Sequence, residues 1–191
     1  MVLPNATLFP NTLLPLFIFQ PRYRAMLAWA LEHERMFCIA TMKPGIAEAT
    51  DVSQFHHRSC VGFVRACVGH DDGTSHLILQ GLQRVRFSGF TQDAPFRIAE
   101  LEVLESEESD AIEAGDLAAK IRERCSKFIA VNDPTGETLE QHLERIDDHG
   151  KLSDVVAHSF LTDPESRRML LQELDLTARL RLLLKLLREA E

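Results

Sequence analysis

Two histidines and two aspartates lie close together in the sequence, at His70, Asp71, Asp72 and His76. A histidine pair, His56-His57, precedes them in a polar segment. A structural zinc site needs about four ligands in fixed geometry, and adjacent residues of an extended segment point to opposite sides. We therefore interpret these side chains as solvated loop and turn residues, and we predict neither a metal site nor a cofactor.

The sequence also lacks the patterns of nucleophilic and ATP-driven catalysis. It contains no Gly-x-Ser-x-Gly elbow. Gly150-Lys151 is not a phosphate-binding loop, because Arg145 replaces the first glycine of that motif and Leu152 follows the lysine. We predict that the protein is not an enzyme and has no catalytic residues. The alternative is a small metal-dependent hydrolase that uses the turn at residues 70–72.

Acidic charge is concentrated in the second part of the chain. Residues 1–104 contain nine Lys/Arg and nine Asp/Glu, whereas residues 105–191 contain twelve and twenty, so the whole net charge of −8 lies there. A surface of this sign repels phosphate backbones, and we predict no nucleic-acid partner. Arg84 and Arg86 alternate with apolar residues and could form a basic stripe, but we favour a solvated sheet face balanced by nearby glutamates.

The cysteines and the N-terminal residues indicate the cellular compartment. Cys38, Cys60, Cys67 and Cys125 form no Cys-x-x-Cys pair and lie in apolar runs, which is typical of buried thiols in a reducing environment. Prolines interrupt the N-terminal apolar run, unlike a signal peptide. No run approaches the ~20 apolar residues of a membrane span. We expect a cytoplasmic protein that does not bind membranes.

The N-terminal region contains a strand that runs directly into a helix. Leu14–Phe19 is rich in aromatic and branched residues, as in a buried strand. Pro21 suits the first position of a helix, and the apolar positions from Tyr23 onward repeat with helical spacing. We expect the aromatic residues of this junction, Phe17, Phe19 and Tyr23, to belong to the core.

Short apolar runs separated by turn signals then predict a sheet. Met36–Met42 reads as a strand, and segment 43–57 has no hydrophobic period and reads as a long loop. An Asp-Gly turn separates the next runs, and we interpret Gly81 as a further turn. These runs predict a curled antiparallel sheet or small barrel with one inserted helix. The remaining predicted strands are Ser59–Val68, His76–Gln80, the alternating residues around Val85 and Phe87, and Phe96–Leu104.

The composition changes at the acidic segment 105–110, after which helical spacing dominates. Asp163 can cap a helix that starts at Pro164. We predict an α+β protein with a β-rich subdomain at 1–105 and a helical bundle at 106–191. The other predicted helices are Ile112–Val131, Leu139–Ile146, Leu152–Phe160 and a last one from Leu176 to the end.

Several segments together carry a family resemblance. LFPNTLLPLFIFQPRYRAML, VGFVRACVGHDDGTSHLILQGLQRVRF and PFRIAELEVLE look like the N-terminal domain of Lon proteases, and LSDVVAHSFLTDPESRRMLLQELDLTARLRLLLKLLRE is similar to its helical part. The resemblance implies a free-standing β-rich subdomain with a helical bundle, and a role in holding protein substrates or partners. The ATPase and Ser-Lys peptidase modules of Lon proteases are missing from the sequence, so proteolysis and ATP hydrolysis are not implied.

We predict a non-catalytic protein- or peptide-binding module, an adaptor or chaperone-like binder. An apolar groove between the sheet and the loop 43–57 would take up unfolded or apolar protein segments. Phe55 is expected to be exposed there, although a loop can also bury one Phe at its own base. The leucine-rich last helix could be enclosed by other helices or could meet a second copy in a homodimer. The candidate contact residues are Phe55, His56, Phe17, Arg22, Leu183 and Leu187.

Overall fold

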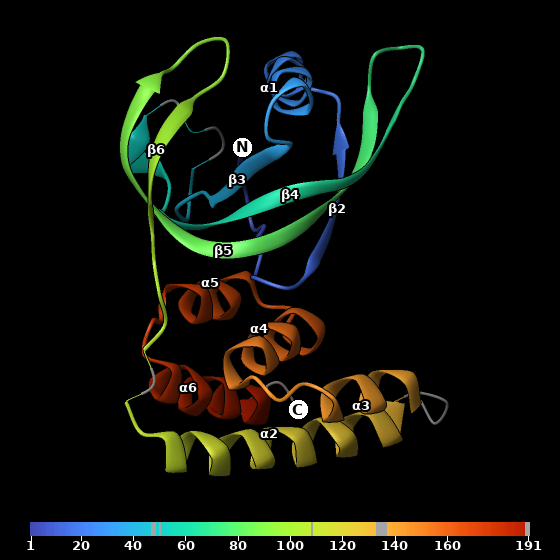
Figure 1. The fold of residues 1–191 in the computed structure, drawn as a ribbon, viewed down its shortest axis with the longest axis vertical. Coiled ribbons are helices and arrows are strands. Elements are labelled where there is room, and N and C mark those ends of the chain that lie inside the picture. The colour runs from blue at the N-terminus through green and yellow to red at the C-terminus, as the bar shows by residue number, and fades with distance from the viewer. Residues whose placement is uncertain (47–48, 50, 108, 133–136, 190–191) are drawn as a thin grey trace. The chain divides into compact units, whose positions relative to one another are not determined.

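The chain is an α+β protein, as predicted, with an open six-stranded sheet among its described residues and with helices that mostly follow the sheet in the sequence (Figure 1). The described residues form two compact units, which we call the sheet unit (Met1–Leu104) and the helical unit (Glu105–Glu191). The computed structural model describes residues 1–46, 49, 51–107, 109–132 and 137–189.

The sheet unit is built around one long strand, β5. The first part of β5 pairs antiparallel with β2, and its last part pairs antiparallel with β6. The strand order is β1-β3-β4-β5-β2, in which only β1 and β3 are parallel. Because β1 and β2 remain at the two edges, the structure is a curled sheet and not a closed barrel. The strands are β1 (Val2–Leu3), β2 (Leu13–Ile18), β3 (Met36–Thr41), β4 (Arg58–Gly69), β5 (Ser75–Gln92) and β6 (Ile98–Val103).

Gly81 lies inside β5, so its interpretation as a turn was wrong. The N-terminal segment crosses the strand at this point. The Asn11 N–H donates to the Gly81 carbonyl at 2.9 Å, and the Gly81 N–H donates to the Thr12 carbonyl at 2.9 Å. A Cβ atom on Gly81 would lie only 1.9 Å from the Phe9 carbonyl oxygen. The glycine is therefore needed because two backbone segments approach each other closely here. Besides bends, such close approaches are a common reason for glycine inside a strand.

Helix α1 (Pro21–Glu32) begins at the predicted proline and lies on the concave side of the sheet (Figure 1). Tyr23 is buried, as expected. Phe17 and Phe19 are exposed by 47% and 56%, so their assignment to the core was wrong. The physical reason is that β2 is an edge strand that alternates between its two faces. Ile18 is buried on one face, and Phe17 points to the other.

The last residues of the segment that follows β3 return to the sheet at Phe55. Asp51 caps the 3-10 helix Val52–Gln54, where its side chain accepts from the Ser53 N–H at 2.8 Å. Phe55 then forms an isolated antiparallel bridge with Met42 and is only 1% exposed. The prediction of an exposed Phe55 was therefore wrong, because its own segment folds it inward.

The helical unit contains the predicted succession of helices. Asp163 caps the helix that starts at Pro164, and its side chain accepts from the Ser166 N–H at 2.8 Å. No helix within the described residues is long and apolar enough to cross a membrane. The helices are α2 (Ala111–Asn132), α3 (Glu137–Glu144), α4 (His149–Phe160), α5 (Pro164–Gln172) and α6 (Leu176–Glu189).

The leucines of α6 form the core of the helical unit. Leu183 and Leu187 are buried, and α2, α4 and α5 all contact α6. A helix enclosed on several sides needs apolar residues around most of its circumference. The prediction of Leu183 and Leu187 as partner contacts was therefore wrong, and the homodimer proposed on their basis loses its support.

Candidate functional site

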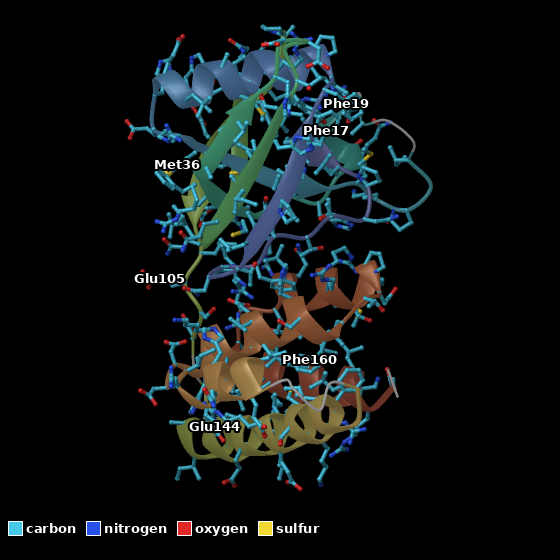
Figure 2. The ribbon with its side chains drawn as sticks, turned by 90° about the vertical axis from the view of Figure 1, so that its right-hand side faces the viewer. Phe17, Phe19, Met36, Glu105, Glu144 and Phe160 are labelled. Carbon is cyan, nitrogen blue, oxygen red and sulfur yellow. The ribbon has the colours of Figure 1, made fainter. Side chains whose placement is uncertain are left out.

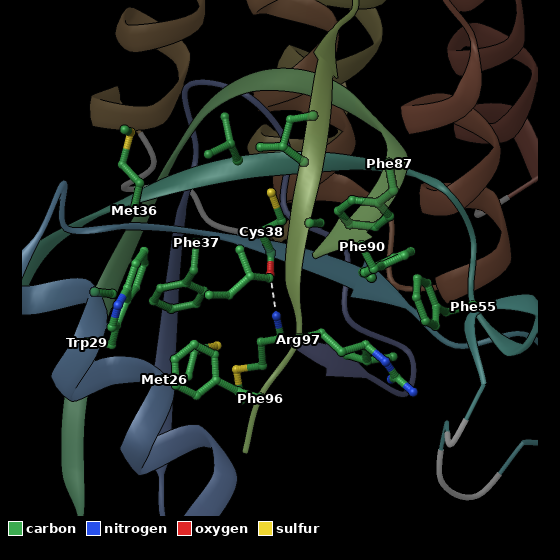
Figure 3. Close-up of a pocket in the computed structure, with 18 of the residues that line it drawn as sticks. Met26, Trp29, Met36, Phe37, Cys38, Phe55, Phe87, Phe90, Phe96 and Arg97 are labelled. Atoms are coloured by element: carbon green, nitrogen blue, oxygen red, sulfur yellow. Dashed lines mark hydrogen bonds between the residues drawn. The ribbon is translucent and has the colours of Figure 1, made fainter. Parts of the chain in front are cut away.

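An apolar cavity in the sheet unit lies between α1, the concave face of the sheet and the segment leading into β6 (Figure 3). Its volume is about 280 Å³. Glu34 and Arg97 are the charged side chains among those that line it, and the Met1 amino group also lies in the lining. We call it the aromatic cavity. Its main lining residues are Met26, Trp29, Met36, Phe37, Cys38, Phe55, Phe87, Phe90, Phe96, Arg97, Ala99 and Leu101.

A distortion of β5 brings two aromatic residues to the same wall of the cavity. Phe87 and Phe90 are three residues apart, so a regular strand would place them on opposite faces. The β5–β6 register shifts between Phe87 and Gly89 and again between Phe90 and Gln92. As a result both rings lie at the cavity, with their centroids 5.8 Å apart. Such a bulge re-aims a side chain without ending the strand.

The opposite wall comes from α1 and the segment before β6. Trp29 is 40% exposed, and its ring centroid lies 6.1 Å from that of Phe96. His33, one helical turn further on, stacks on the indole at 4.0 Å. Met26 lines the same wall deeper in the unit and is buried. Figure 3 shows Trp29 and Met36 at one end of the cavity and Phe55 at the other. A partly exposed tryptophan thus borders an apolar interior.

Phe55 and Arg97 form the far end of the cavity. The Phe55 ring meets those of Phe87 and Phe90 edge-on, at 5.9 and 6.0 Å. The Arg97 guanidinium lies 5.7 Å from the Phe55 ring centroid, within the range of a cation–π contact. The Arg97 Nη1 donates to the Ala49 carbonyl at 3.3 Å. This end is therefore closed by packed groups, and the exposed rim lies at Trp29.

An adjoining cavity of about 290 Å³ shares Met26, Phe96 and Arg97 with the first. Arg22 lines this second cavity, where its guanidinium carbon lies 4.8 Å from the ring centroid of the neighbouring Tyr23. Together the two cavities follow α1 along the concave side of the sheet. They provide room for more than one side chain of a bound segment.

Cys38 is the thiol inside the aromatic cavity. Its carbonyl accepts a hydrogen bond of 2.8 Å from the Met1 amino group, the dashed line in Figure 3. Burial raises the pKa of the Cys38 thiol from 9.0 to about 11. In the helical unit, burial raises the pKa of Cys125 to about 12. The thiolate is the reactive form of cysteine, so both thiols are unreactive near neutral pH.

We expect Cys38 in the native protein to react with iodoacetamide at pH 8 about 100-fold more slowly than a thiol of ordinary pKa, because a pKa raised by about two units leaves about 100-fold less thiolate. The rate should rise about tenfold for each pH unit between pH 8 and 10. Peptide mass spectrometry after timed labelling measures this, with the unfolded chain as the control. A native Cys38 as reactive as the unfolded one would contradict the buried thiol.

The predicted contact residues are distributed over different places. Phe55 lines the aromatic cavity and Arg22 the adjoining one. His56 is half-buried outside both linings, and its N–H donates to the Thr41 carbonyl at 3.0 Å. Phe17 lies on the opposite face of the sheet. Among the described residues of the loop 43–57, Phe55 and Ala49 line these two cavities, which follow α1. A groove along the rest of that loop stays a prediction.

Four cavity residues, Trp29, Phe37, Phe90 and Phe96, were missed by sequence reasoning. The sequence did contain a signal for Trp29, which is the one tryptophan of the chain. It lies next to the buried face of helix α1 without being part of it, as a partly exposed contact residue would. That buried face consists of Tyr23, Met26, Leu27 and Ala30. Phe90 carried no such signal, since its direction depends on the bulge in β5.

A second apolar surface lies on the outer face of β2 and β4. Figure 2 shows Phe17 and Phe19 there, and their rings stack at 5.8 Å. Leu13 and Val68 are also more than half exposed on this face. We call these four residues the outer patch. A shallow depression of about 410 Å³ lies between Phe17 and Val68.

Comparison with known proteins places the fold in one family. The family model described as the ATP-dependent protease La (LON) substrate-binding domain matches residues 1–189. The Lon protease of Desulfosudis oleivorans is 25% identical over 186 residues, covering 95% of this chain and 22% of that protein. The Lon protease of Brucella suis is 26% identical over 172 residues, covering 88% and 21%. The chain thus spans about a fifth of the length of these relatives.

Solved structures show the same fold. The N-terminal domain of a Mycobacterium avium complex Lon protease superposes with a TM-score of 0.79 at 16% identity, covering 99% of this chain and 96% of that one. A Lon N-terminal domain protein from Xanthomonas campestris superposes with a TM-score of 0.66 at 20% identity, covering 96% and 95%. The similarity therefore includes both the sheet unit and the helical unit.

Proposed function

The chain belongs to the family of ATP-dependent protease La (LON) substrate-binding domains, and we propose that it is a non-catalytic module that binds apolar segments of other proteins in the aromatic cavity. The family supports a role in substrate recognition. The observation that carries the proposal is a cavity of about 280 Å³ walled by aromatic side chains, with the partly exposed Trp29 at its rim.

Binding in this cavity would depend on burial of apolar surface more than on hydrogen bonds. Concave sites of this size lined by aromatic side chains are the usual form of a ligand pocket. Burying one large apolar side chain contributes about 1.5–3 kcal/mol. One or two such side chains offset only part of the entropy lost on association. The expected affinity for a single segment is therefore weak, and the preference would be for exposed apolar residues and not for one sequence.

Weak binding of exposed apolar segments is the property of an adaptor or chaperone-like module. Unfolded proteins present many such segments, whereas folded proteins hide them. Several weak contacts along one unfolded chain raise the overall affinity without any single strong contact. We therefore assign unfolded or apolar protein segments as the partners of this chain. The acidic charge of the helical unit does not favour a nucleic-acid partner.

The single tryptophan provides a direct test. Trp29 borders the cavity and is the one tryptophan in the sequence. A permanently unfolded probe without tryptophan, such as a reduced and alkylated protein in which Trp has been replaced, should shift the Trp29 emission to shorter wavelength as it binds. The shift should saturate with probe concentration. The same protein in its native, disulfide-bonded form should give no shift, and equal shifts with both forms would reject the proposal.

Replacing Phe96 with alanine should weaken binding of this probe about tenfold, because about 1.4 kcal/mol of burial is lost at the cavity wall. Isothermal titration measures the affinity independently of Trp29, and circular dichroism checks the fold. Phe17→Ala is the control, since Phe17 is an exposed aromatic residue of the outer patch and does not line the cavity. The opposite result, weaker binding by Phe17→Ala alone, would assign the function to the outer patch.

A further inference from the structure

Two histidine side chains meet at the end of the β4–β5 hairpin. The Nε2 atom of His70 and the Nδ1 atom of His76 are 2.8 Å apart, and both residues are exposed. The two rings lie edge to face, with their centroids 5.0 Å apart. The two nitrogens share a proton in a hydrogen bond, and neutral imidazole nitrogens are also the commonest metal ligands in proteins. From this geometry we propose that His70 and His76 form a two-histidine chelate for Cu²⁺ or Ni²⁺.

The hairpin brings the two rings together through its register. Val68 pairs with His76, and the His70 N–H donates to the Thr74 carbonyl at 2.9 Å. His70 and His76 are therefore diagonal neighbours on one face of the sheet, where side chains are within reach of each other. This proximity could not be read from ligand spacing alone, because it depends on the turn closing at Gly73, whose φ is 78°.

The surroundings support the His76 ring and order the turn that carries His70. Phe17 of β2 stacks on the His76 ring, with 4.6 Å between centroids. In the turn, the Asp72 carboxylate accepts hydrogen bonds from the Thr74 N–H at 2.9 Å and from its hydroxyl at 2.7 Å. These bonds lower the pKa of the Asp72 carboxyl, so it adds negative charge beside His70. A site ordered before the metal arrives loses less entropy on binding.

The separation of the nitrogens fits one coordination geometry better than another. With metal–nitrogen bonds of about 2.0 Å, two nitrogens 2.8 Å apart subtend an angle of about 90°. That is the angle between neighbouring ligands in the square-planar or tetragonal geometry of Cu²⁺ and Ni²⁺. The tetrahedral geometry of zinc requires the nitrogens to be about 3.3 Å apart. The chelate therefore favours Cu²⁺ and Ni²⁺ over Zn²⁺.

Metal binding requires only small movements. Each ring turns about its Cβ–Cγ bond to direct its lone pair at the metal, which the broad torsional minimum of an imidazole permits. The ring that donates the shared proton transfers it to its other nitrogen, so the neutral pair loses no proton. Within the described residues, no group of three or more His, Cys, Asp or Glu side chains is placed to hold a metal. The remaining coordination positions are thus left to water or to a ligand from another molecule.

Electron paramagnetic resonance of the full chain with Cu²⁺ tests the chelate. The protein is stripped of metal, carries no histidine tag, and competes with glycine for the ion. We expect one Cu²⁺ per chain with the splitting of two coordinated imidazole nitrogens. His70→Gln or His76→Gln should weaken binding about 100-fold, because the second ligand no longer acts intramolecularly. The double variant should be scarcely weaker than either single one, since one remaining histidine cannot chelate.

His142→Gln is the matched control, because His142 is an exposed histidine on α3. It should bind Cu²⁺ like the unmodified chain. Equal binding by the His70→Gln and unmodified proteins would overturn the site. Zn²⁺ that binds as tightly as Ni²⁺ in the same competition would overturn the assigned geometry. All three exposed substitutions should keep the circular dichroism spectrum of the unmodified chain, so that a loss of binding reports the ligand and not the fold.

Discussion

Replacing Gly81 with alanine should destabilise the sheet unit by about 4 kcal/mol or more, at the extreme of what single substitutions do. The added Cβ would lie 1.9 Å from the Phe9 carbonyl oxygen and 2.8 Å from its carbonyl carbon. Both are backbone atoms, which cannot rotate away as a side chain can. Relief of the clash would separate the N-terminal segment from β5 and break the hydrogen bonds that join Gly81 to Asn11 and Thr12.

Hydrogen exchange of the full chain, followed by mass spectrometry, measures where stability is lost. Peptides from residues 1–104 should lose their protection in the Gly81→Ala variant. Gly69→Ala is the matched control, because the nearest atom to its added Cβ is the Ser75 hydroxyl at 3.9 Å. That substitution should change the stability by less than about 0.5 kcal/mol. Normal protection in Gly81→Ala would show that the N-terminal segment does not cross β5 there.

Gly81 also shows which parts of the fold a sequence can predict. Helix starts were predicted well because their signals are local: Pro21 at the first turn, and Asp163 before Pro164. A glycine in a strand pattern has two meanings, a turn or a close approach of another segment. Only the distant segment at Phe9 decides between them. That segment is far away in the sequence, so no local pattern contains the answer.

The candidate site was harder to predict for the same reason. Phe55 and Phe17 are both aromatic residues in short segments, yet the first is buried and the second exposed. What separates them is the bridge of Phe55 to Met42 and the position of β2 at a sheet edge. Both features arise only in the folded tertiary structure and leave no pattern in the local sequence. Family resemblance predicted the fold class and a binding role, whereas the location of the cavity along α1 required the assembled sheet.

Replacing Arg179 with alanine should destabilise the helical unit by about 4 kcal/mol, from the lost packing of a buried side chain and from the loss of its hydrogen bonds. Arg179 is only 1% exposed. Its Nη1 donates to the Ser106 hydroxyl at 3.0 Å and to the Glu173 carbonyl at 3.1 Å. It therefore joins the first residues of the unit to the turn between α5 and α6. The backbone pairing of Glu107 with Leu174 and Leu176 reinforces the same connection.

Arg181 on the same helix provides the matched control. It is exposed and pairs with the Glu113 carboxylate. Exposed ion pairs contribute little to stability, so Arg181→Ala should leave hydrogen exchange in residues 105–191 nearly unchanged, while Arg179→Ala should abolish protection there. Similar effects of the two substitutions would contradict a structural role for the buried arginine.

Replacing Arg179 with methionine separates the two causes of the expected loss. Methionine fills much of the arginine volume but donates no hydrogen bond. If most of the loss comes from the empty space left by the truncated side chain, Arg179→Met should recover most of the stability that Arg179→Ala loses. We expect recovery of about half, because the Glu173 carbonyl and the Ser106 hydroxyl still lack their donor. Lysine should not do better than methionine, since its strongly hydrated ammonium group loses more on burial than the weakly hydrated guanidinium does.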